Sequence, residues 1–274
     1  MREISRNGLE KPNHLRYNEP MKNENYQAQD FAPMVSNNFE IRLVQTEAEL
    51  NEVLRLRYQD LLLYYNANNT NETGLFTDRY DAFCDHLIVV DRTANVIAGT
   101  YRLVRKEHIA RFGKFISENE YDIQAIKDRN IMELGRAVVR KDYRNGAVIM
   151  LLWKGIFAYA SANKIEYLFG TASFTGVNLE DYRHGFSYLY YHYLAEKDIL
   201  AIGEHQTRLD LLSESEIDPE RAKKQLPPLV KGYVRIGARF GKNIFIDVPF
   251  NSLDVFVLLD ANNLDAKYVK KIME

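Results

Sequence analysis

The sequence predicts a mixed α/β fold in which helices flank a central, mostly antiparallel sheet. Short runs rich in β-branched residues alternate with stretches whose apolar residues recur at helical spacing. Two of these runs, residues 87–90 and 96–104, enclose the turn-forming residues 91–95, which predicts an antiparallel hairpin. Residues 130–156 pass from an apolar strand pattern through a basic turn into an apolar helix pattern. We expect this strand–turn–helix stretch to form the centre of the site.

The N-terminal part of the chain is expected to contain an arm, a strand and a helix. Residues 1–38 are rich in Asn, Glu, Lys and Pro without helical or strand period, which predicts a polar arm, extended or disordered, ahead of one domain at 39–274. That domain opens with a strand at 39–44. Thr46 and Glu49 then form a capping-box pattern at the start of a helix.

The remaining elements follow from the same signals of period, turn residues and caps. They are a helix to about residue 65, a polar loop at 66–73, a partly helical connection at 105–129, a strand at 167–174, a helix at 179–195 capped by Asn178, a charged helix at 218–225, a helix or turn at 231–239, and strands at 245–248 and 254–259.

Composition and charge exclude several classes of protein. The 274 residues are 46% hydrophobic and 27% charged, which is typical of a globular protein with a sizeable core. A formal net charge of −2 gives no overall attraction to nucleic acid, and we expect no nucleic-acid partner. Cys84 is the only cysteine, so an intrachain disulfide is excluded and a reducing compartment is expected.

Membrane insertion and secretion are not expected from the sequence. The first residues are charged and polar and lack the apolar core of a secretory signal. The longest apolar stretch, residues 147–162, is too short for a bilayer. We therefore expect a cytoplasmic protein, and peripheral contact with the inner face of the membrane is a further expectation.

Two charged residues in the strand part of the 130–156 stretch are candidates for chemistry. Acyl transfer to an amine needs a base, because an α-amine is largely protonated at neutral pH. Glu133 could take that proton, directly or through water. Arg136, three residues later, is expected on the opposite side of the strand, where it would orient a loop or a carrier phosphate. The alternative is that both are solvated charges at a strand end.

The turn after this strand is a candidate anion site. It places cations and backbone N–H groups before a helix that starts near Ala147. Glycine before a helix is common, so the pattern alone does not specify a ligand. The residues that we assign to donor or carrier binding are Arg140, Lys141, Arg144, Asn145, Gly146 and Ala147.

Other catalytic patterns are weaker or missing. His86 and Asp91 have the spacing of a His-x4-Asp acyltransferase motif, but an offset of five places them on opposite faces of a strand. The remaining histidines lack His-x-x-x-His spacing, so no metal site is expected. The sequence also lacks a Gly-x-Ser-x-Gly elbow, a Walker loop and a Gly-x-Gly-x-x-Gly fingerprint.

Seven segments, in order along residues 39–259, give a family resemblance. They are Cys84-Asp-His-Leu87, Gly99-Thr-Tyr-Arg-Leu103, Glu133-Leu-Gly-Arg136, Tyr143-Arg-Asn-Gly-Ala-Val-Ile-Met-Leu-Leu-Trp153, Leu168-Phe-Gly170, Leu226-Pro-Pro-Leu229 with Lys231-Gly-Tyr233, and Asp254-Val-Phe256. With them the chain resembles the ornithine lipid N-acyltransferases, the "hemolysin-like" branch of the GNAT superfamily. That branch is related to long-chain N-acyl amino acid synthases and acyl-homoserine lactone synthases.

The resemblance implies a GNAT-like acyltransferase fold, a splayed acyl-binding cleft and a set of site residues. The related lactone synthases carry an ordered polar set, which Arg57, Asp78, Asp81, Arg102, Glu133 and Arg136 match here. The resemblance implies that Glu133, Arg136 and Arg102 are catalytic residues, with Glu133 as the base. Substrate binding is assigned to Arg57, Asp78, Asp81 and Asp85.

One departure from the superfamily concerns the acyl donor. Acetyl-CoA users carry Gln/Arg-x-x-Gly-x-Gly/Ala at the pyrophosphate loop, whereas Arg144 lies only two residues before Gly146. As the family implies, the donor is then an acyl group on the phosphopantetheine of acyl carrier protein, with acyl-CoA as the alternative and no bound cofactor. Lys154 joins the basic turn as a candidate contact for the acidic carrier.

The expected reaction is transfer of a long-chain (3-hydroxy)acyl group to the α-amine of an amino acid, giving a lyso-aminolipid. L-Ornithine is the favoured acceptor. Three alternatives stay open: an N-acyl amino acid synthase for glycine or another amino acid, a non-catalytic acyl-binding protein with this fold, and an O-acyltransferase using His86 and Asp91.

Overall fold

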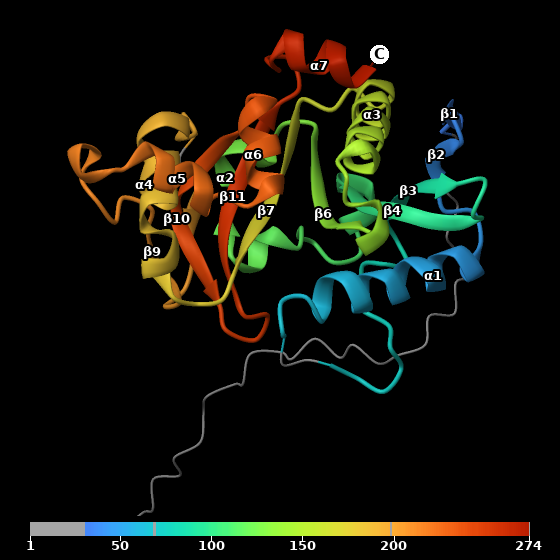
Figure 1. The fold of residues 1–274 in the computed structure, drawn as a ribbon, viewed down its shortest axis with the longest axis horizontal. Helices are drawn as coiled ribbons and strands as arrows, with labels where there is room; N and C mark the ends of the chain where they lie inside the picture. The colour runs from blue at the N-terminus through green and yellow to red at the C-terminus, as the bar shows by residue number, and fades with distance from the viewer. Residues whose placement is uncertain (1–30, 68–69, 198, 274) are drawn as a thin grey trace, which may run out of the picture.

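A nine-stranded sheet crosses the whole molecule, with helices on both of its faces (Figure 1). The computed structural model describes residues 31–67, 70–197 and 199–273. The strand order is β1-β2-β3-β4-β6-β7-β11-β10-β9. Its strands are β1 (Met34–Ser36), β2 (Phe39–Leu43), β3 (Asp85–Asp91), β4 (Val96–Arg105), β6 (Ile131–Val139), β7 (Tyr167–Thr175), β9 (Gln206–Arg208), β10 (Arg239–Asp247) and β11 (Ser252–Asp260). A two-stranded sheet pairs β5 (Tyr121–Asp122) with β8 (Leu200–Ala201).

Neighbouring strands of the large sheet are antiparallel except β6 and β7. These two are joined by helix α3 (Ala147–Ala162), the kind of crossover that a parallel pair requires. The predicted mostly antiparallel α/β fold is therefore confirmed, including the hairpin of β3 and β4. The strand–turn–helix stretch supplies both the parallel strand and the crossover.

The sheet begins earlier than the sequence indicates. Residues 1–30 of the expected arm lie outside the described residues, but Met34–Ser36 pair with β2 as an antiparallel hairpin. The expected boundary at residue 38 falls inside this hairpin, where Asn37 takes the left-handed conformation at a φ of 53°. Asparagine tolerates this conformation, and a three-residue strand is too short to show a period.

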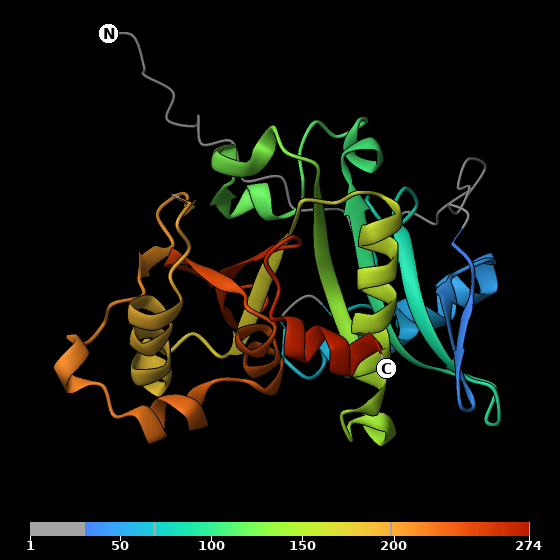
Figure 2. The same cartoon turned by 90° about the horizontal axis from the view of Figure 1, so that it is seen from above.

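The two faces of the sheet are covered by different helices. Helix α3 packs against β2, β3, β4 and β6, and α7 (Ala266–Met273) lies beside it (Figure 2). On the opposite face lies α1 (Glu47–Arg57), continued by a π-helical turn at Tyr58–Leu62 (Figure 1). Thr46 caps α1 by accepting a hydrogen bond from the backbone N–H of Glu49 at 3.2 Å, as predicted.

Several C-terminal elements differ in extent from their predictions. The helix expected at 179–195 starts as a 3₁₀ turn (Leu179–Tyr182) and continues as α4 (Arg183–Tyr193). Helix α5 (Pro219–Gln225) ends before Pro227, and α6 (Pro228–Arg235) begins at Pro228. Proline is tolerated in the first turn of a helix, so Pro228 can start α6. The connection at 105–129 includes α2 (Gln124–Lys127) and the unpredicted β5.

Candidate active site

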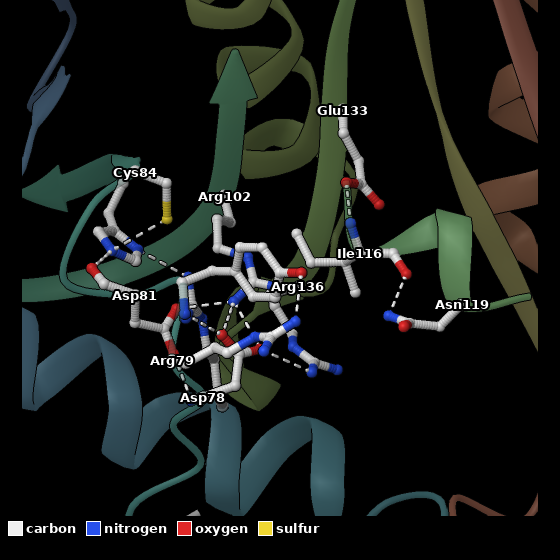
Figure 3. A network of polar contacts seen from close by, with 12 residues as sticks. Asp78, Arg79, Asp81, Cys84, Arg102, Ile116, Asn119, Glu133 and Arg136 are labelled. Atoms are coloured by element: carbon white, nitrogen blue, oxygen red, sulfur yellow. Dashed lines mark hydrogen bonds and ion pairs between the residues drawn. The ribbon is translucent and has the colours of Figure 1, made fainter. Parts of the chain in front are cut away.

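Five charged side chains from distant parts of the chain form a buried network, here called the central ion cluster. Arg57 ends α1, Arg102 lies on β4, and Asp78 and Asp81 lie in the loop before β3. Arg102 Nη1 lies 2.8 Å from both carboxylate oxygens of Asp78 and 2.9 Å from Asp81 Oδ1. Arg57 Nη1 donates to the same Asp81 oxygen at 2.7 Å. Arg136 is the fifth member, through a 3.1 Å bond from Nη2 to Asp78 Oδ2 (Figure 3).

Burial and mutual attraction fix the charges of this cluster. Burial opposes ionisation of Asp81, but Arg102 and Arg57 hold the pKa of its carboxyl far below the usual range. Burial and the Arg57 charge lower the pKa of His86 to about 3, so this imidazole is neutral. Its Nδ1 accepts from Arg57 Nη2 at 2.8 Å, and its Nε2–H donates to the Asp81 carbonyl at 2.8 Å.

Arg136 lies on the same side of the strand as Glu133 and Arg102, so the expectation that it would face away from Glu133 was wrong. In the ladder, Arg102 pairs with Gly135 and Thr100 with Val138, so two residues of β6 face one residue of β4. This bulge, together with a φ of 53° at Arg136, breaks the strict alternation of side chains. The Arg136 guanidinium thereby reaches Asp78, which also binds Arg102, and it stacks on Phe76 at 4.3 Å.

Glu133 is a buried residue, only 4% exposed, and not a solvated charge at a strand end. Its carboxylate accepts from the backbone N–H groups of Ile116 and Ser117, each at 2.8 Å, and from the Ser117 hydroxyl at 2.5 Å (Figure 3). Burial raises the pKa of Glu133, and these hydrogen bonds act against the rise. The carboxylate therefore tethers the segment that leads into Glu120.

Asp85 does not join the other predicted substrate-binding residues. It accepts a hydrogen bond from the Tyr159 hydroxyl and lies 3.7 Å from His108 Nε2. The cause is strand alternation, because the next residue, His86, points to the central ion cluster. His86 also has no part in a dyad: Asp91 instead accepts from the Tyr143 hydroxyl at 2.9 Å and from loop N–H groups.

The basic turn is largely tied to its own chain. Arg140 donates to the Ile97 carbonyl and to Glu52, at 2.9 and 3.2 Å. Arg144 donates to the Val139 carbonyl and to Asp60, at 2.9 and 3.4 Å. Lys141 is exposed on this turn.

The start of α3 is built as the sequence predicts. Gly146 caps the helix at a φ of 95°, a conformation that favours glycine. The side-chain oxygen of Asn145 accepts from the Ala147 N–H at 3.0 Å, so one of the orphan helix donors already has a partner. Asn145, Gly146 and Ala147 are exposed, which leaves this helix start accessible from solvent.

The parallel strands β6 and β7 separate soon after they meet. They pair only from Ile131 with Tyr167 to Glu133 with Phe169, although both strands run on for six more residues. Gly170 lies at the point of separation, where a Cβ would be 2.3 Å from the Leu134 carbonyl oxygen. We call the opening between the two strands the splay, and it confirms the predicted splayed sheet.

Different side chains lie on the two faces of the sheet at the splay. A small, mostly apolar pocket lies on the α3 side and is lined by Leu134, Leu168, Phe169, Gly170, Thr171, Tyr233, Val257 and Leu259. The side chains of Glu133 and Phe169 alternate with those of Leu134 and Leu168, so they point to the other face, toward Ile116 and Phe115. The splay therefore lies between an apolar pocket on one face of the sheet and Glu133 on the other.

Sequence reasoning missed a second charged group, here called the acidic cluster. Carboxylate oxygens of Glu120, Asp247 and Asp254 lie within 4.8 Å of one another. Burial, followed by the charge of Asp247, raises the pKa of Asp254 to about 7, and burial also raises the pKa of Glu120 and Asp247. The three residues are far apart in the sequence, and only Asp254 was part of a family motif.

A second group of possible metal-binding atoms, in Asp81, Cys84 and His86, fits a metal poorly. The Asp81 carboxylate already binds Arg57 and Arg102, and the His86 Nδ1 accepts from Arg57. A cation there would have to displace two guanidinium groups. Over residues 31–67, 70–197 and 199–273, every helix falls short of the length and apolar character of a bilayer span.

Comparisons with known proteins agree with this architecture. The family model of the acetyltransferase (GNAT) domain matches residues 56–154. L-Ornithine N(alpha)-acyltransferase of Rhodobacter capsulatus is 32% identical over 240 residues, which cover 84% of this chain and 93% of that protein. Proteins of the same name from Brucella abortus and Agrobacterium fabrum are 33% and 34% identical over 244 residues, with 84% of this chain and 87% and 83% of those proteins covered.

The fold and these matches define an acyltransferase of the GNAT class. Within that class, the chain belongs to the family of the L-ornithine N(alpha)-acyltransferases. Among solved structures, FeeM, an N-acyl amino acid synthase from uncultured soil microbes, is 10% identical with a TM-score of 0.49, covering 85% of this chain and 93% of that chain. The chain belongs to this family because of its identity with the relatives, and the similarity to FeeM adds nothing to that conclusion.

Proposed function

We propose that this acyltransferase moves a (3-hydroxy)acyl group from acyl carrier protein to the α-amine of L-ornithine. The product is a lyso-aminolipid, so the reaction is a step of lipid biosynthesis. The observation that carries the proposal is the splay, which has an apolar pocket on one face of the sheet and buried charges on the other. The relatives named as L-ornithine N(alpha)-acyltransferases support the acceptor.

The acceptor approaches from the charged face in this proposal. Arg136 has 21% of its side chain exposed and is the most accessible member of the central ion cluster, so it binds the α-carboxylate. Glu133 accepts the proton of the α-ammonium, directly or through water. The neutral amine then attacks the thioester carbonyl, the C–S bond breaks, and the phosphopantetheine thiol leaves with one proton.

The donor approaches from the α3 face. Its acyl chain enters the sheet at the small apolar pocket, and the phosphate of its pantetheine arm meets the exposed N-terminus of α3 at Gly146 and Ala147. Lys141, Arg144 and Arg140 give this edge its positive charge for an acidic carrier.

Reconstitution tests the reaction directly. We expect the purified protein, given 3-hydroxyacyl carrier protein and L-ornithine, to yield N-acylornithine by mass spectrometry and to release free carrier thiol. The same assay with 3-hydroxyacyl-CoA should be slower. No N-acyl amino acid with either donor, from folded protein, would contradict the proposed function.

The role of Glu133 is tested by Glu133→Gln. If Glu133 is the base, turnover falls about 10²-fold or more, because an amide cannot accept the proton. The hydrogen bonds to Ile116 and Ser117 make stability the necessary second readout. An unchanged turnover with a lower melting temperature would restrict Glu133 to holding its loop.

Charge reversal at Arg144 tests carrier docking. Arg144→Glu should raise the KM for acyl carrier protein several-fold and change the KM for a free acyl thioester little, because only the carrier has an extended acidic surface. Glu204→Gln, at an exposed position far along the chain, is the control. Equal losses with both donors would argue against docking at this turn.

A further inference from the structure

The acidic cluster is unusual because three carboxyl groups meet where burial disfavours negative charge. Asp254 lies on β11, Asp247 ends β10, and Glu120 precedes β5, in the segment that Glu133 holds through Ile116 and Ser117. Among the residues that the structure describes, none of the three forms an ion pair within 4.0 Å. Carboxylates in such a place are stabilised by a cation.

Individual atoms in this cluster also lack hydrogen-bond partners. Asp254 is only 3% exposed, yet its Oδ1 is buried without a partner, as is Glu120 Oε2. The hydroxyls of Ser173 and Ser252, the latter a fully buried residue two positions before Asp254 on the same face of β11, act as hydrogen-bond donors to the Asp254 carboxyl and lower its pKa, so neither of them is free. Buried polar atoms are almost always paired, so the two unpaired carboxylate oxygens together mark a place where a ligand completes the bonds.

We propose that Glu120, Asp247 and Asp254 bind the side-chain ammonium of the acceptor amino acid and thereby select a diamino acid. The proposal rests on the proposed function for the identity of the acceptor as an amino acid. It goes further by assigning a subsite that reads the far end of the substrate, away from the amine that reacts.

The shape and charge of the ligand follow from the surrounding groups. A primary ammonium donates three hydrogen bonds and carries one positive charge, which suits a set of three carboxyl groups. Arg136 is the cation whose charge acts on all three of these carboxyl groups, and it belongs to the central ion cluster. An α-amino acid with a side-chain ammonium can use the guanidinium and the carboxylates together, whereas a metal ion would use the carboxylates alone.

Isothermal titration of the full chain with two amino acids tests the subsite. Ornithine and norvaline have the same carbon chain, and norvaline lacks only the side-chain amine. We expect ornithine to bind at least about 10-fold more tightly than norvaline, as for loss of a charge-assisted hydrogen bond. Equal affinities, or no binding of ornithine, would overturn the proposal without any variant.

Amide substitutions then locate the discrimination. Asp254→Asn and Asp247→Asn should each weaken ornithine binding about 10-fold and leave norvaline within about 2-fold, because only ornithine presents a cation there. Asp128→Asn, at an exposed carboxylate next to α2, is the matched control and should change neither. If the two cluster variants keep the preference for ornithine, the subsite lies elsewhere.

Two further arms separate rival explanations. Mg²⁺ and Ca²⁺ are titrated alone, and ornithine is titrated after treatment with EDTA. Tight binding of either metal, with loss of the ornithine preference after EDTA, would identify the cluster as a metal site and overturn the proposal.

If ornithine and norvaline are acylated equally well, the subsite fails while N-acylation stands. If ornithine binds selectively but no amino acid is acylated, the proposed function fails and the subsite stands.

Discussion

The central ion cluster and the acidic cluster lie on the same face of the sheet and differ in how their carboxylates are satisfied. All four carboxylate oxygens of Asp78 and Asp81 accept at least one hydrogen bond from Arg57, Arg102, Arg136 or a backbone N–H. In the acidic cluster, Asp254 Oδ1 and Glu120 Oε2 have no partner.

This difference separates a structural from a ligand-binding role. A buried charge with every acceptor paired holds three chain segments together and offers little to a substrate. A buried charge with open acceptors leaves a free-energy deficit that a ligand can remove. On this view the predicted substrate residues Asp78 and Asp81 shape the site, while the acceptor is recognised at Arg136 and at the acidic cluster.

The largest effect is expected when the central ion cluster is broken. Arg102→Met leaves Asp78 and Asp81 buried with one cation fewer, which should lower the free energy of unfolding by about 3–5 kcal/mol in urea denaturation. Arg144→Ala removes a more exposed ion pair with Asp60 and should cost less than about 1 kcal/mol. Similar losses for the two variants would remove the distinction between the clusters.

A smaller effect is expected at the splay that lies beside both clusters. The Cβ of Gly170→Ala would lie 2.3 Å from the Leu134 carbonyl oxygen, so β6 and β7 must move apart. We expect a loss of about 1–3 kcal/mol in stability, as for overpacking. Gly135→Ala on β6 has open space around its Cβ and is the control. Equal stabilities in thermal unfolding would show that the splay does not depend on this close approach.

The acidic cluster should reveal itself in the pH dependence of stability. The pKa of Asp254 is about 7 in the folded protein and near 3.8 when unfolded, so between these values the folded state holds the extra proton. Stability therefore falls as the pH rises from about 4 to 7, and Asp254→Asn should be the more stable by on the order of 2 kcal/mol at pH 8. Burial and the charge of Asp247 raise the pKa of Asp254, the hydroxyls of Ser173 and Ser252 and the charge of Arg136 lower it, and Glu120 and Tyr65 also interact with this carboxyl.

Urea unfolding of the unliganded protein at pH 4.5, 6, 7 and 8 checks this prediction. The stability difference between Asp254→Asn and the parent protein should grow with pH and shrink when ornithine is added. Asp128→Asn should show no such trend. If the stability difference between Asp254→Asn and the parent protein stays constant with pH, Asp254 has an ordinary pKa and the cluster does not store unfavourable charge.

Local signals were sufficient for most of the fold. The capping pattern at Thr46, the turn residues between β3 and β4 and the glycine before α3 act through neighbouring residues, and the structure has each of them as predicted. The strand at 34–36 and the extent of β10 depend on pairing with distant strands, which no local pattern encodes.

The site was less predictable because it is assembled from several elements. Order along the chain brought Arg57, Asp78, Asp81, Arg102 and Arg136 into one set, and they do meet in space. Asp85 was assigned to substrate binding together with Arg57, Asp78 and Asp81, although alternation on β3 turns it to the other face. Glu120 and Asp247 carried no motif, since their meeting with Asp254 depends on the tethered loop and on the β10–β11 pairing.

Regiochemistry of the product tests the central claim most directly. If the acidic cluster holds the side-chain ammonium of ornithine while the α-amine lies at the splay, acylation occurs only at the α-nitrogen. Tandem mass spectrometry of the reconstituted reaction should therefore give Nα-acylornithine as the sole product. Nδ-acylornithine, or a mixture of the two, would contradict the account.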